Sequence, residues 1–334
     1  MGLLRYVVIV WAIASVIATI VLVDQKSYGG RPYYLVEHLF LPCAVTLTLA
    51  IVAVLQGWLD VGGAAASLAV GLSHSASHAS LLFALLAFFV SSSCATSVGK
   101  RAKKRLDPTY KKGGQRNIVQ VFSNGAVATS AALSYLYFSA FSAPGSDGYE
   151  SISFQFVDPA LLSAVACMAA LAGCCGDTWA SEFGILQGSN LPRHVLTLRP
   201  VPAGTNGGIS FIGTACSLLG GLLVGVAFFV GMSVQHIIDK DVAGLTLSCW
   251  PAIPIGALSG LLCSTIDSIL GATLQYSGRD TSKNCVVNQP GPDVEHITGR
   301  DILDNHAVNF LSSLLTALIV PAVVYSLSEE PWSV

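Results

Sequence analysis

Long apolar segments recur along the chain, separated by shorter polar stretches. Eight are long enough to cross a bilayer as helices, which takes about 20 largely apolar residues. A ninth run, 62–73, is shorter and rich in glycine and alanine, a composition that lets neighbouring helices approach closely. The pattern predicts an all-α, polytopic membrane bundle of eight or nine transmembrane helices. The eight longer segments cover 3–23, 39–58, 79–98, 117–140, 160–184, 208–231, 251–275 and 303–326.

The first apolar segment predicts a retained helix rather than a cleaved leader. It runs from Tyr6 to Val23 without a charge, which is longer than the apolar core of a signal peptide, and no cleavage box follows. The N-terminus also lacks the features of a plastid or mitochondrial transit peptide. We therefore expect an endomembrane protein, for example of the endoplasmic reticulum. It divides into N-terminal helices (1–60), a membrane catalytic bundle (61–326) and a short non-cytosolic tail (327–334).

Composition agrees with a membrane protein and excludes two other classes. Apolar residues make up 53% of the chain and charged residues 11%, against roughly a quarter charged in soluble domains. The net charge of -2 excludes the basic excess of a nucleic-acid binder. Most of the nine cysteines lie in apolar runs, which predicts core residues rather than zinc or redox centres.

Basic residues are distributed unevenly between the loops. Eight lie in 99–116, and five more lie in 185–207 and 276–302. The loops 141–159 and 232–250 and the C-terminal tail together contain one lysine. Because short loops rich in lysine and arginine stay in the cytosol, the first three loops are expected to be cytosolic.

Four apolar segments carry carboxylates and amides at their expected cytosolic ends. Such groups are costly at lipid-facing positions, so they normally face a cavity or one another. Helix caps and interhelical hydrogen bonds would explain any one of them, but would be scattered over both ends of the bundle. The clustering at one end predicts a shared cytosol-facing site. Its members are Asn117, Gln120 and Asn124; Asp177, Thr178, Ser181 and Glu182; Asp267 and Gln275; and Asp304, Asn305 and Asn309.

A glycine-rich turn, 202–208, leads into the apolar segment 208–231, downstream of Arg193 and Arg199. Such a turn can present backbone N–H groups to phosphate at the start of a helix, although packing glycines would have the same composition. A phosphate cradle opposite carboxylates implies Mg²⁺, which binds a few carboxylates together with phosphate oxygens. The expected cradle is Gly204, Thr205, Asn206, Gly207 and Gly208, and the expected Mg²⁺ ligands and catalytic residues are Asp177, Glu182, Asp267 and Asp304.

Five motifs together resemble the transmembrane protein 19 family, whose plant relatives are phytyl phosphate kinases. The resemblance covers about 60–326 and implies an all-helical enzyme related to polyprenol and dolichol kinases. Those enzymes phosphorylate isoprenoid substrates with a nucleoside triphosphate, often CTP. The motifs are GDTWASE at 176–182, PAGTNGGIS at 202–210, RNIVQVFSNG at 116–125, DSILGATLQ at 267–275 and DNHAVNF at 304–310.

Residue pattern and resemblance together predict a kinase that transfers a phosphoryl group from CTP, or another nucleoside triphosphate, to an isoprenyl monophosphate. Arg116, Arg193 and Arg199 would join the polar residues in binding phosphate. The expected partners are the bilayer and the isoprenyl substrate, with no nucleic acid. Two alternatives are a transporter or channel that uses the polar cluster as an ion or solute site, and a non-catalytic scaffold.

Overall fold

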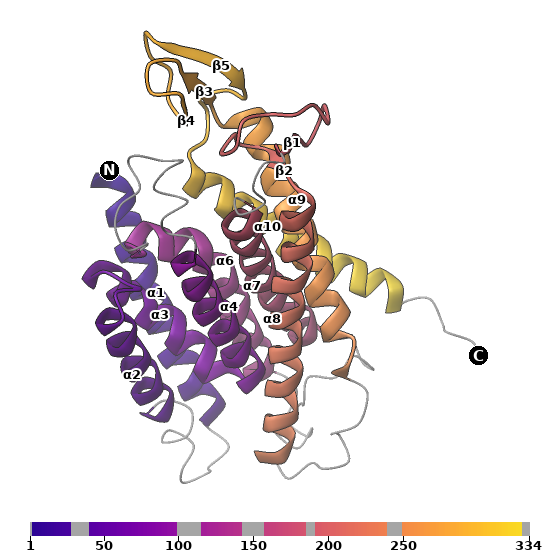
Figure 1. Ribbon diagram of the computed structural model, residues 1–334. Helices are drawn as coiled ribbons and strands as arrows, with labels where there is room; N and C mark the ends of the chain where they lie inside the picture. Colours follow the sequence, from indigo (N-terminus) through magenta and orange to yellow (C-terminus); the bar gives the residue numbers. More distant parts are fainter. Residues whose placement is uncertain are drawn as a thin grey trace, which may run out of the picture.

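The computed structural model describes residues 2–27, 40–98, 115–141, 157–184, 191–238 and 249–328. These residues form a bundle of nine helices with two small antiparallel sheets at one end, here called the hairpin end (Figure 1). The predicted all-α polytopic fold is confirmed, and the strands lie outside the bundle. The helices are α1 (Gly2–Ser27), α2 (Leu41–Leu55), α3 (Val61–Ser77), α4 (Ala79–Ser97), α6 (Ile118–Phe141), α7 (Pro159–Gly184), α8 (Phe211–Ile238), α9 (Ala252–Leu274) and α10 (Asn305–Ser328).

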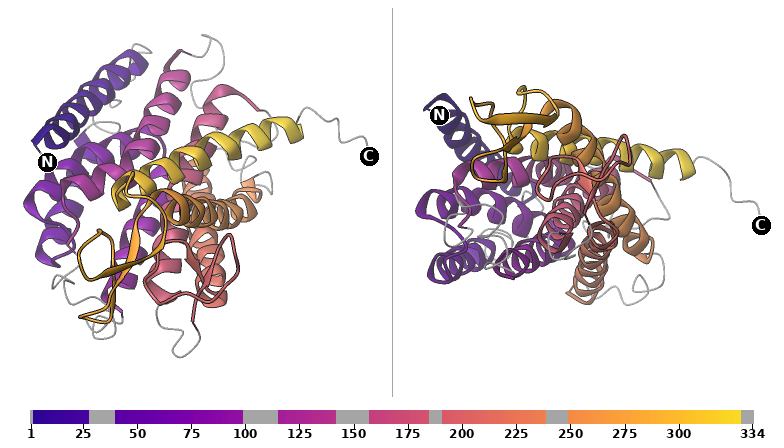
Figure 2. Two further views of the ribbon diagram at one scale, coloured as in Figure 1. Left: turned by 90° about the horizontal axis from the view of Figure 1, so that it is seen from above. Right: turned by 45° about the horizontal axis from the view of Figure 1, so that its top comes forward.

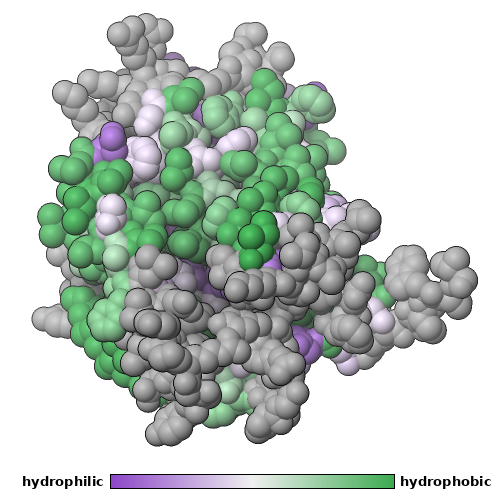
Figure 3. Space-filling view, turned by 90° about the horizontal axis from the view of Figure 1, so that it is seen from below, coloured by the Kyte–Doolittle hydropathy of each residue, from purple (hydrophilic) through white to green (hydrophobic). Residues whose placement is uncertain are grey.

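The outer faces of the bundle suit a lipid environment. In the described part of the chain, α4, α7, α8, α9 and α10 are long and apolar enough to cross a membrane, and α1 and α2 contain shorter apolar stretches. Large apolar side chains such as Val10, Ile17 and Leu258 are exposed. Figure 3, which views the molecule from the end opposite the hairpins, shows that hydrophobic residues make up much of the coloured surface.

The short apolar run 62–73 belongs to a helix that follows the length of the bundle. Before α3 begins, the Asp60 N–H donates to the Arg116 carbonyl at 3.2 Å. At the other end of α3, the Ser77 hydroxyl donates to the carbonyl of Ala132, deep in α6. The single residue His78 then connects α3 to α4 and caps α4. The structure therefore favours the nine-helix count, which puts the N-terminus at the hairpin end (Figure 1).

Helix α7 occupies the middle of the bundle, with α1 and α2 on one side and α8 and α9 on the other (Figures 1 and 2). Its Val165, Met168 and Leu171 are completely buried. Glycines set the spacing on the α8–α9 side. A Cβ atom at Gly260 would lie 2.8 Å from the Gly221 Cα, and one at Gly176 would lie 2.7 Å from the Gly260 Cα. These three helices are therefore in backbone contact, as small residues permit.

The two sheets lie at the end of the bundle where α8 begins and α9 ends (Figure 1). Strand β1 (Arg193–His194) pairs with β2 (Gly208–Ile209), and β3 (Ser277–Asp280) lies between β4 (Cys285–Val287) and β5 (Val294–Thr298). His194 is 2.9 Å from the Thr298 hydroxyl, which in turn donates to the carbonyl of Ala272 in α9. The sheets are thus joined to each other and to the bundle.

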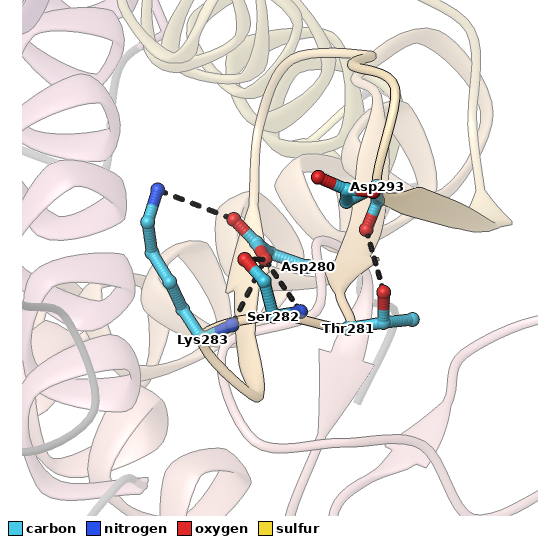
Figure 4. A network of polar contacts seen from close by, with 5 residues as sticks. All are labelled: Asp280, Thr281, Ser282, Lys283 and Asp293. Carbon is cyan, nitrogen blue, oxygen red and sulfur yellow. Dashed lines mark hydrogen bonds and ion pairs between the residues drawn. The ribbon is translucent and has the colours of Figure 1, made fainter.

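The turn between β3 and β4 is organised by Asp280 (Figure 4). One carboxylate oxygen accepts hydrogen bonds from the Ser282 hydroxyl at 2.6 Å and from the N–H groups of Ser282 and Lys283 at 3.0 Å. These bonds, led by the Ser282 hydroxyl, lower the pKa of Asp280 to about 2. Thr281 donates to the Asp293 carbonyl through both N–H and hydroxyl. The hairpin is therefore held by its own residues.

Two predicted segments, the basic loop and the C-terminal tail, lie partly outside the described residues. Seven of the eight basic residues in the loop 99–116 lie outside the described ranges, and only Arg116 can be placed. The predicted tail 327–334 overlaps α10, which extends to Ser328, and the remainder also lies outside the described ranges.

Candidate functional site

The carboxylates of Asp177 and Asp267, on α7 and α9, lie close enough to interact electrostatically. Each also has a serine partner. Ser264 hydrogen bonds to Asp177, and the Ser312 hydroxyl donates to Asp267 at 3.4 Å. We call Asp177 and Asp267 the carboxylate pair. Because two like charges are costly in a partly buried place, this arrangement calls for a cation or a proton between them.

Helices α6 and α10 complete the polar surroundings of the pair. The Asn309 amide donates to the Asn124 side-chain oxygen at 3.2 Å, and the Cys174 thiol contacts the Asn124 carbonyl at 3.5 Å. The structure thus brings together all four segments whose polar residues the sequence placed at one depth. Ser264 and Ser312 were not among the predicted residues, although each lies three positions from a predicted one, on the same helix face.

The four expected carboxylates do not form one cluster. Asp304 accepts the Ala307 N–H at 2.8 Å and so caps α10. Glu182 follows Asp177 by five positions, which places it about 140° away around α7. Within the described ranges, no three aspartate, glutamate, histidine or cysteine side chains gather closely enough to hold a metal ion. The predicted four-carboxylate Mg²⁺ site is therefore reduced to the carboxylate pair.

Several other predicted residues have local structural roles. Asn117 accepts the Gln120 N–H, and Gln120 accepts the Asn117 N–H, both at 3.0 Å, which is a capping box at the start of α6. The hydroxyls of Thr178 and Ser181 donate to carbonyls of their own helix. Gln275 is buried at the end of α9, whereas Asn305 is exposed at the start of α10.

The glycine-rich turn does not lead directly into a helix, contrary to the prediction. Strand β2 intervenes, and Ser210 caps α8 by accepting the Gly213 N–H at 3.0 Å. Gly208 pairs with His194 across the small sheet. Because this pairing and the cap take up the residues before α8, the turn does not present free amides at the helix start.

Within the turn, the N–H groups of Thr205, Asn206 and Gly208 already have acceptors. Thr205 and Gly208 donate to Pro202 and Thr205 carbonyls, and Asn206 donates to the Ser277 hydroxyl. Gly207 has φ +75°, and a Cβ there would lie 2.8 Å from the Ala272 Cα. Gly204 alone is open, with φ +90° and no contact closer than 3.8 Å. The geometry thus favours packing over a phosphate cradle for Gly207 and Gly208.

The three predicted arginines occupy different positions. Arg193 and Arg199 are exposed in the β1 region, where Arg193 donates to the Leu198 carbonyl. Arg116 instead turns its guanidinium inward, over the rings of Phe88 and Phe89 at 5.3 and 5.6 Å. Burial lowers the pKa of Arg116 to about 10, so it stays charged at neutral pH.

Arg116 and the carboxylate pair both lie near Cys174. That thiol is close enough to interact with Arg116, with Asp177 and with Asp267. Within the described ranges no ion pair is formed by Arg116. The site therefore combines two carboxylates that interact with each other and a nearby inward-facing cation, an arrangement suited to a group that carries both negative charge and bound cations.

The chain matches relatives over most of its length. It is 40% identical to Protein PGR of Arabidopsis thaliana over 235 residues, which is 70% of this chain and 78% of the relative. It is 27% identical over 191 residues to a membrane protein of Synechocystis sp., covering 57% of this chain and 62% of that one. A membrane protein of Methanocaldococcus jannaschii is 24% identical over 199 residues, or 59% and 66%.

No solved structure gives a significant match. The model of the family described as integral membrane protein DUF92 matches residues 44–317, which cover most of α2 and most of the predicted catalytic bundle 61–326. This match and the likeness to Protein PGR confirm the family resemblance drawn from the motifs. The chain is a multi-pass integral membrane protein and belongs to the DUF92 family.

Proposed function

We propose that the protein is a membrane-embedded kinase that transfers the terminal phosphoryl group of a nucleoside triphosphate, with CTP favoured, to an isoprenyl monophosphate. The observation that carries this proposal is the carboxylate pair at the hairpin end, with Arg116 inward-facing nearby. An acceptor oxygen of the monophosphate forms the new P–O bond while the bond to the nucleotide's β-phosphate breaks. The products are an isoprenyl diphosphate and a nucleoside diphosphate.

Phosphoryl transfer depends mainly on positioning and charge neutralisation. Arg116 would hold the acceptor phosphate from one side. Asn124 and Asn309 would fix the helix ends around it through their mutual hydrogen bond. Ser264 and Ser312 would orient the two carboxylates by the bonds they already make.

The donor set fits Mg²⁺, since two adjacent carboxylates leave most coordination positions to phosphate oxygens and water. Asp177 and Asp267 would hold the ion, which would neutralise charge on the transferring phosphoryl group when bound. Glu182 and Asp304 are left out of this ligand pair, because Asp304 caps α10 and Glu182 lies about 140° from Asp177 around α7.

The nucleotide would approach from the hairpin end. Arg193 and Arg199 are exposed there, and the basic loops of the sequence favour a cytosolic position for this end. An isoprenyl phosphate would have its chain among the helices and its phosphate at the same depth as the carboxylate pair. We propose an endomembrane location, such as the endoplasmic reticulum, with the site facing the cytosol.

Product formation by the purified protein tests the proposal. A panel of isoprenyl monophosphates is incubated with CTP or ATP and Mg²⁺, and the diphosphate is measured. We expect turnover with at least one pair. Asp177→Asn should lower it about ten- to a hundredfold or more, as loss of a metal ligand does.

Asp158→Asn provides the matched control. Asp158 begins the same helix at the opposite end, where it accepts the Leu161 N–H, and asparagine is an equally good cap. Turnover should be unchanged in this variant. Absence of product with every pair, or equal activity of the Asp177 and Asp158 variants, would contradict the proposed function. A transporter or a scaffold would give the first of these results.

A further inference from the structure

A cavity with about 90 Å³ of free space and an open mouth lies among α2, α3, α4 and α6. Its walls are apolar over most of their extent, with Ala50 from α2, Val70 from α3 and Leu82 and Leu86 from α4. The residues that line it span seven positions of α2, which corresponds to about 10 Å along the helix axis. It is thus a narrow, elongated and mostly apolar pocket that opens at one side.

Polar groups line this cavity mainly at its hairpin end, where Arg116, Gln120 and Asn124 contribute to the wall. Only Thr46 and Ser67 add hydroxyls further along. Arg116 comes from the segment that pairs with Leu59. Its cation is held by aromatic faces rather than by an acidic residue within the described ranges. An inward-facing cation at the polar end of an apolar cavity is complementary to an anionic group such as phosphate.

From this combination we infer that the cavity among α2, α3, α4 and α6 binds the apolar chain of a single-chain lipid phosphate, and that Arg116 binds its phosphate. One narrow apolar pocket with one cation at its polar end is complementary to such a molecule. A phospholipid with two chains would need a wider space, and a free phosphate would leave the apolar walls unused. A chain longer than the pocket would continue through the open mouth.

The inference rests on the proposed function for its importance, since it assigns the acceptor subsite of that reaction. Asn124 links the two regions. It lines the cavity and also bonds Asn309 beside the carboxylate pair. A phosphate on Arg116 would therefore lie near Cys174, which also interacts with Asp177 and Asp267. The pocket for the apolar chain would thus end near the carboxylate pair, where the phosphoryl group is transferred.

A second apolar cavity makes a matched control possible. It lies among α1, α6, α7 and α10 and includes Ala166 in its wall. Its lining has no basic side chain. Ala50→Leu fills part of the first cavity, and Ala166→Leu makes the same change in the second.

The test measures binding of geranylgeranyl monophosphate to the purified full-length protein in the absence of nucleotide. Ala50→Leu and Arg116→Gln should each raise the Kd at least tenfold, whereas Ala166→Leu should leave it unchanged. Geranylgeraniol, which lacks the phosphate, and inorganic phosphate, which lacks the chain, should both bind at least tenfold more weakly than the intact probe. Melting temperature, recorded for each variant, restricts the comparison to folded protein, and Leu82→Phe replaces Ala50→Leu if the latter does not fold.

Unchanged affinity in a folded cavity-filling variant, or equal binding of phosphatidic acid or of inorganic phosphate, would overturn the inference. Weakened binding by Ala166→Leu instead would place the chain in the second cavity and would also overturn it. Because no turnover is required, the two proposals can fail separately. Tight binding without product would contradict the proposed kinase alone, and turnover unaffected by both cavity-filling variants would contradict the assigned subsite alone.

Discussion

The two sides of the bundle are packed in different ways around α7. On the side of α8 and α9, glycines put backbones in direct contact, so that a Cβ at Gly221 or Gly256 would meet backbone atoms of the facing helix. On the side of α2, α3, α4 and α6, a Cβ at Gly71 or Gly125 would meet a side chain of the facing helix rather than its backbone, and a cavity remains. The side of α8 and α9, here called the close side, fixes the helices that carry Asp177 and Asp267. The side of α2, α3, α4 and α6, here called the open side, has room for a ligand. One bundle thus provides both a rigid carboxylate pair and a pocket.

Substitution of a glycine on the close side should have the largest effect on stability. A Cβ at Gly260 would lie 2.8 Å from the Gly221 Cα, and a backbone atom cannot move aside as a flexible side chain can. We expect Gly260→Ala to cost about 1–3 kcal/mol of stability or more, as overpacking does. Thermal melting in detergent measures the effect.

Gly62, on α3, provides the control for this prediction. A Cβ there would have its nearest contact at an ordinary 3.5 Å, and alanine is the better helix former. Gly62→Ala should therefore leave the melting temperature unchanged or slightly higher. Equal destabilisation by the two variants would show that the difference between the two sides does not depend on backbone contact.

The glycine-rich turn should behave as part of the close side. Gly207→Ala should lower the melting temperature because of the positive φ and the contact with Ala272. The KM for either phosphate-bearing substrate should stay unchanged in the folded fraction, because the neighbouring amides are already bonded. A KM increase of about tenfold without loss of stability would instead support the phosphate cradle predicted from sequence.

The smallest effect is expected on the open side, at the start of α6. Asn117→Ala removes the acceptor for the N–H groups of Val119 and Gln120. Loss of such a cap costs about 1 kcal/mol. We expect a small decrease in melting temperature with KM and kcat preserved, and Asn117→Ser should restore stability. A large loss of kcat in Asn117→Ala would instead support the role of Asn117 in phosphate binding that the sequence predicts.

The sequence predicts the helices well because each long apolar segment is a local signal. The spacing of Asp177, Asp267 and Asn309 along their helices also locates the polar end of the bundle correctly. The sequence does not decide whether 62–73 crosses the membrane, because a helix buried among others needs little apolar surface of its own. The structure alone shows that the chain reverses direction at His78, between α3 and α4.

Other features of the site depend on contacts between distant residues. Gly207 packs on Ala272, which lies far along the chain, so sequence alone could not separate packing from phosphate binding. Arg116 counts as one of eight basic loop residues until the fold turns it toward Phe88. By contrast, the Asn117–Gln120 capping box has a readable sequence signature, and its spacing could have indicated the structural role.

The central claim is that Asp177 and Asp267 act as one unit in phosphoryl transfer, and a double-variant cycle tests it most directly. Turnover of geranylgeranyl monophosphate with CTP is measured for Asp177→Asn, Asp267→Asn and both together, with Asp158→Asn as control. Because groups that act as a unit are not additive, we predict that each single variant loses about ten- to a hundredfold or more and that the double variant loses little further. Retention of more than about a tenth of the activity in either folded single variant, or losses that multiply in the double variant, would contradict the account.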